Sequence, residues 1–86
     1  MGIQEEFVSE FSRRIRAEAE AKARAEGEVQ GRAVATAEAV LRVLAARGIA
    51  MDETIAARVR ECRELSRLNA WLELAVRVEK ADSLFD

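Results

Sequence analysis

Residues 17–35 read AEAEAKARAEGEVQGRAVA, a run of small and charged residues. Alanine, glutamate, lysine and arginine are strong helix formers, and the chain contains no proline that would interrupt a helix. Gly27 and Gly31 act against the helix, because each costs about 1 kcal/mol relative to alanine in a helix interior. We therefore expect a continuous helix from Ile3 to Arg47, with any kink or break at these glycines.

Apolar or small residues recur at every fourth position along this helix. Residues four apart lie near each other on a helix surface, so the series forms a stripe that drifts slowly around the axis. Its first members are large and its later members are small, and the small part would let a second helix approach closely. We expect the long helix to mediate oligomerisation through Phe7, Phe11, Ile15, Ala19, Ala23, Gly27 and Gly31.

Acidic residues also precede basic residues by four positions, a spacing that supports a helix by about 0.2–0.5 kcal/mol per pair. The charged pairs are Glu10/Arg14, Glu18/Lys22, Glu20/Arg24, Glu28/Arg32 and Glu38/Arg42.

If it is unbroken, the long helix would measure about 65–70 Å at 1.5 Å per residue, which is too long for a compact domain of this size.

The sequence Arg47-Gly48-Ile49 predicts the end of the long helix, because glycine suits the left-handed position that follows a helix. Asp52 predicts the start of the next helix, since its carboxylate can accept free backbone N–H groups. This second helix should run from about Glu53 to Cys62.

The remaining apolar pattern predicts a third helix from about Leu65 and a last turn near Asp82 to Phe85. The chain is therefore expected to be all-α, with a long helix in residues 1–47 and a short helical bundle in residues 48–86 that packs on its end. The expected core of this bundle is Leu41, Leu44, Ile49, Ile55, Val59, Cys62, Leu68, Trp71, Leu72, Leu84 and Phe85.

The bulk composition excludes several classes of protein. With 14 basic and 16 acidic residues the net charge is −2, which gives no global attraction to phosphate or to an anionic membrane. The single cysteine, Cys62, allows no intrachain disulfide and favours a reducing compartment. No stretch approaches the ~20 apolar residues that span a bilayer, and Glu5 and Glu6 stand where a secretory signal would be basic. We expect a cytoplasmic protein that does not bind a membrane.

The sequence predicts no catalytic, cofactor or metal site. Glu20-Ala21-Lys22 matches the Glu-x-Lys half of a restriction-type nuclease site, but on a helix these side chains point in different directions. The acidic residues lack the spacing of a known cation-binding loop. Cys62 has no histidine to act as its base, because the chain contains none.

Basic clusters at Arg13–Arg16 and at Arg58, Arg60 and Arg63 suggest an alternative function, a small helical DNA-binding regulator. The interleaved glutamates and the negative net charge favour an ordinary solvated surface for these arginines, so nucleic acid is not the expected partner. Self-association is favoured instead, because an isolated arm would leave Phe7, Phe11 and Ile15 in water, at a loss of ~25 cal/mol per Å² of apolar surface. The expected assembly is a homodimer or homotetramer.

Several segments together resemble a known protein tail. These are Ser9-Glu10-Phe11-Ser12-Arg13-Arg14, the glycine- and alanine-containing tetrads, and Val43-Leu44-Ala45-Ala46-Arg47-Gly48-Ile49. The closing pattern Cys62-x-x-Leu65-x-x-Leu68-x-x-Trp71-Leu72-x-x-Ala75, followed by Asp82-Ser83-Leu84-Phe85, belongs to the same resemblance. The chain resembles the C-terminal region of bacterial proteins of the recombination-promoting nuclease (Rpn) and transposase-like PD-(D/E)XK family, especially the actinobacterial ones. Its tetrads are more alanine-rich than the family pattern.

The resemblance implies a tail that assembles a nuclease, without the nuclease domain and without any of its catalytic residues. In some members of that family a short protein consisting of the tail alone binds and restrains the full-length nuclease. The resemblance therefore implies a non-enzymatic, antitoxin-like partner of a longer nuclease that shares the same tail.

Overall fold

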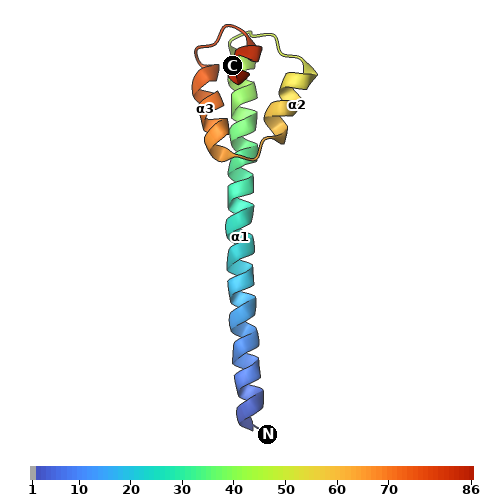
Figure 1. Ribbon diagram of the computed structural model, residues 1–86, viewed down its shortest axis with the longest axis vertical. Helices are drawn as coiled ribbons and strands as arrows, with labels where there is room; N and C mark the ends of the chain where they lie inside the picture. The colour runs from blue at the N-terminus through green and yellow to red at the C-terminus, as the bar shows by residue number, and fades with distance from the viewer. Residues whose placement is uncertain (1) are drawn as a thin grey trace.

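The computed structural model describes the backbone of residues 2–86 and the side chains of residues 9–86. It is all-helical, with 81% of the chain in helix and no strand in the described residues. Helix α1 spans Gly2–Ala46, α2 spans Glu53–Glu61, α3 spans Leu65–Ala75, and a 3-10 helix, η1, spans Ala81–Phe85. The short helices gather around the C-terminal end of α1, and the rest of α1 projects from them as a rod (Figure 1). The molecule measures 71 × 21 × 21 Å.

Helix α1 runs without interruption through Gly27 and Gly31, and Figure 1 shows it as a single rod without a sharp kink. The propensity lost at the glycines is spread over a helix of 45 residues, whose other residues are mostly strong helix formers. The break that these glycines could have caused is therefore absent from α1.

A Schellman motif ends α1. The backbone N–H of Gly48 donates to the carbonyl of Ala45, and the N–H of Ile49 donates to the carbonyl of Leu44, each over 3.0 Å. Gly48 has a φ of +73°, the left-handed conformation predicted from the sequence. This turn sends the chain back along α1 toward α2.

Asp52 is the N-cap of α2, as its position predicted. Its Oδ1 accepts a hydrogen bond of 2.9 Å from the backbone N–H of Ile55, the third residue of the helix. Helix α2 then ends at Glu61, one residue before the expected end, and Cys62 is its C-cap. Helix α3 begins at Leu65, where the apolar pattern placed it.

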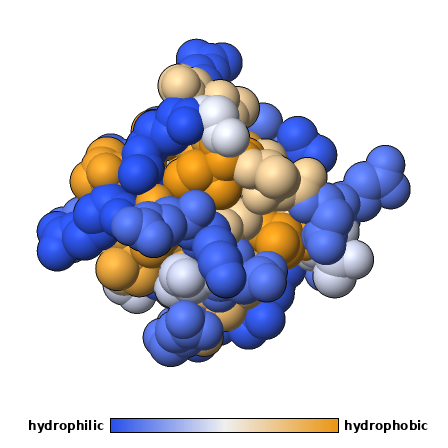
Figure 2. All heavy atoms as spheres, turned by 90° about the horizontal axis from the view of Figure 1, so that it is seen from above, coloured by the Kyte–Doolittle hydropathy of each residue, from blue (hydrophilic) through white to orange (hydrophobic). Residues whose placement is uncertain are grey.

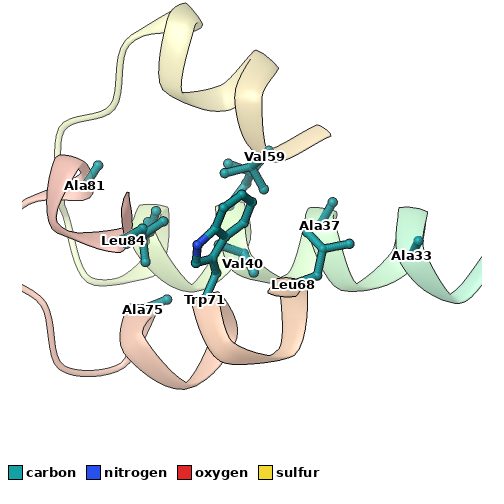
Figure 3. Packing of buried hydrophobic residues seen from close by; sticks show 11 residues of the cluster. Ala33, Ala37, Val40, Val59, Leu68, Trp71, Ala75, Ala81 and Leu84 are labelled. Atoms are coloured by element: carbon teal, nitrogen blue, oxygen red, sulfur yellow. The ribbon is translucent and has the colours of Figure 1, made fainter. Parts of the chain in front are cut away.

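The hydrophobic core lies where α2, α3 and η1 cover one side of α1. Trp71 points from α3 toward Val59 of α2 (Figure 3), and its ring meets the Phe85 ring edge-on at 5.1 Å. Of the expected core, Leu41, Leu44, Val59, Leu68, Trp71 and Leu84 are buried. Half-buried residues at the edge of the cluster are Ile49, Ile55, Cys62, Leu72 and Phe85.

Further residues of the core are buried on three elements. They are Ala33, Ala37 and Val40 on α1, Ala75 on α3 and Ala81 on η1. Ala33 is the first buried residue among the side chains described, so we call residues 33–86 the head and residues 9–32 the arm.

Candidate protein-association site

Every residue of the arm is exposed. The exposed fraction is 54% for Phe11, 50% for Ile15 and 49% for Val29. Phe7, which was expected in the same interface, lies outside the residues whose side chains are described. At 1.5 Å per residue the arm is about 36 Å of helix that no other element of the chain covers.

Gly27 and Gly31 serve no packing need within the chain itself. A Cβ atom built on either glycine would have no atom of this chain within 4 Å. The chain nevertheless has glycine at these positions, although alanine would be about 1 kcal/mol more favourable there. The open space beside Gly27 and Gly31 is therefore available to a group from outside the chain.

The predicted interface residues do not all lie on one side of the straight helix. A step of four residues advances about 40° around a helix of 3.6 residues per turn, so Phe11 and Gly31 are about 160° apart. The middle of the stripe does share a side with neighbouring polar residues. We call this side the pairing face; it contains Ser12, Ile15, Arg16, Ala19, Ala23, Glu26, Gly27 and Gln30.

The charged side chains of the arm form no ion pairs with one another. Among the side chains described, the ion pairs join Arg60 to Glu38 at 2.8 Å and Arg67 to Glu64 at 3.3 Å. None of the pairs expected from the four-residue spacing is formed in this part of the chain. The expected partner of Arg42, Glu38, is instead bound by α2, because the fold brings Arg60 beside it.

The second basic cluster of the DNA-binding alternative, Arg58, Arg60 and Arg63, makes contacts within the head, although all three arginines are exposed. The Arg58 guanidinium lies 4.0 Å from the centroid of the Phe85 ring, a cation–π contact. Arg63 donates to the backbone carbonyl of Arg60 and, over 3.3 Å, to that of Cys62. The hydrogen bond of Arg60 to Glu38 and the charge of that carboxylate raise the pKa of Arg60 above its ordinary value. Each of these three arginines therefore has a partner within the head, whereas Arg13, Arg14 and Arg16 lie exposed on the arm.

Arg47 makes a contact that the sequence pattern did not reveal. Its guanidinium donates hydrogen bonds of 2.7 Å to the carbonyl of Ala75 and 2.6 Å to that of Val78. Ala75 ends α3, so a positive charge meets the negative end of that helix dipole. The residues joined are 28 and 31 positions apart, which is why no local spacing signalled the contact.

The far end of the head carries a shallow hollow of about 490 Å³ between the α1–α2 loop and η1. Ile49, Met51 and Ile55 form its apolar part, and Asp52 and Asp82 stand among its polar residues. Figure 2, which looks onto this end, shows apolar residues at the centre and polar residues around them.

The described residues contain no cluster of three or more acidic or cysteine side chains that could hold a metal ion. Cys62 is half-buried, and its Sγ lies 3.8 Å from the backbone carbonyl of Glu64. Across the part of the chain that the structure describes, no helix has the length and apolar character needed to cross a membrane.

No family model, curated protein or solved structure matches this chain.

Proposed function

We propose that this chain is a non-catalytic helical module that associates with further copies of itself through the arm. The observation that carries the proposal is the contrast between the two halves of α1. Within residues 33–44 one side of α1 is buried against the short helices, whereas the arm is exposed along its whole length, Ile15 and Val29 included.

Physical chemistry supports this assignment, because helices in proteins derive most of their stability from the packing of one face. Burial of apolar arm residues against another helix would contribute ~25 cal/mol for each Å² removed from water. The absence of bulk at Ala19, Ala23 and Gly27 would let the two helix axes come close together.

The partner would include a longer nuclease that carries the same tail, as the resemblance to the Rpn and PD-(D/E)XK proteins implies. A short chain with the same arm would enter mixed assemblies and displace the active arrangement of the nuclease, in the manner of a cytoplasmic antitoxin. The support for this part of the proposal is the sequence resemblance from Ser9 to Asp86, together with the exposed arm.

Light scattering coupled to size exclusion tests the self-association directly. We expect a mass that is a multiple of the 9.6 kDa of one chain. A mass of one chain at every concentration up to the millimolar range would overturn the proposal. Mixing the chain with the longer nuclease then tests the partner: a mixed complex with reduced nuclease activity is expected, and separate elution of the two proteins would refute the antitoxin role.

A further inference from the structure

We draw no further inference here: the strongest candidate, the shallow hollow at the far end of the head whose apolar part is formed by Ile49, Met51 and Ile55, is an unpartnered apolar surface, and nothing in the structure shows what covers it.

Discussion

Arg47 stands at the end of α1 and reaches the carbonyls of Ala75 and Val78 at the end of α3. Hydrogen bonds from a charged donor contribute about 1.5–3 kcal/mol each, and solvent exposure lowers that figure. We predict that Arg47→Ala lowers the free energy of unfolding by about 1–3 kcal/mol, measured by urea denaturation. Arg42→Ala, on the same helix and exposed, is the control and should change stability by less than about 0.5 kcal/mol. Equal effects of the two substitutions would contradict the role given to Arg47.

Gly48 is the one glycine in the described residues whose backbone conformation requires glycine, because its φ is +73°. A Cβ atom in the left-handed region costs roughly 1–2 kcal/mol. Gly48→Ala should therefore lower the free energy of unfolding by about that amount. Gly48→Asn should cost less, since asparagine tolerates this conformation better than alanine does. A neutral Gly48→Ala variant would show that the turn can be closed in another way.

At the scale of elements, local chemistry predicted the helix boundaries well. The glycine after α1 and the aspartate before α2 act on backbone groups within a few residues, so their effects can be inferred from sequence alone. The contacts of Arg47 and Arg60 could not be predicted in this way, because their partners arrive from other helices after folding. The interface predicted from every fourth residue was only partly consistent with the structure. In a straight helix these residues turn about 40° at each step, so Phe11 and Gly31 lie on different sides of α1.

The arm gives the element-scale prediction. Gly27→Leu should raise helix propensity and yet weaken self-association, because the new side chain would fill the open space beside position 27 that lets a second helix come close. Ala21→Leu adds bulk on the opposite side of the helix and serves as the matched control. Analytical ultracentrifugation should show at least a tenfold weaker dimer for Gly27→Leu and less than threefold for the control, by the ~1.4 kcal/mol that a misplaced core side chain costs. Unchanged dimerisation in Gly27→Leu would place the interface elsewhere.

At the scale of the whole molecule, the extended shape has a direct consequence for the dimer. Pairing through the arms leaves each chain extended, so the assembly cannot be shorter than the 71 Å of one chain. Small-angle scattering should therefore give a maximum dimension of about 71 Å or more. A maximum dimension well below this length would show that the arm folds back on the head and would contradict the extended arrangement.

The account as a whole rests on the arm being covered by a second copy. Hydrogen–deuterium exchange, followed at several protein concentrations, measures that cover separately from the stability of the head. Amides of residues 12–30 should exchange more slowly as concentration rises, while those of the buried part of the head should not respond, because its core forms within one chain. Fast exchange along the arm that is independent of concentration, beside a protected head, would contradict the central claim.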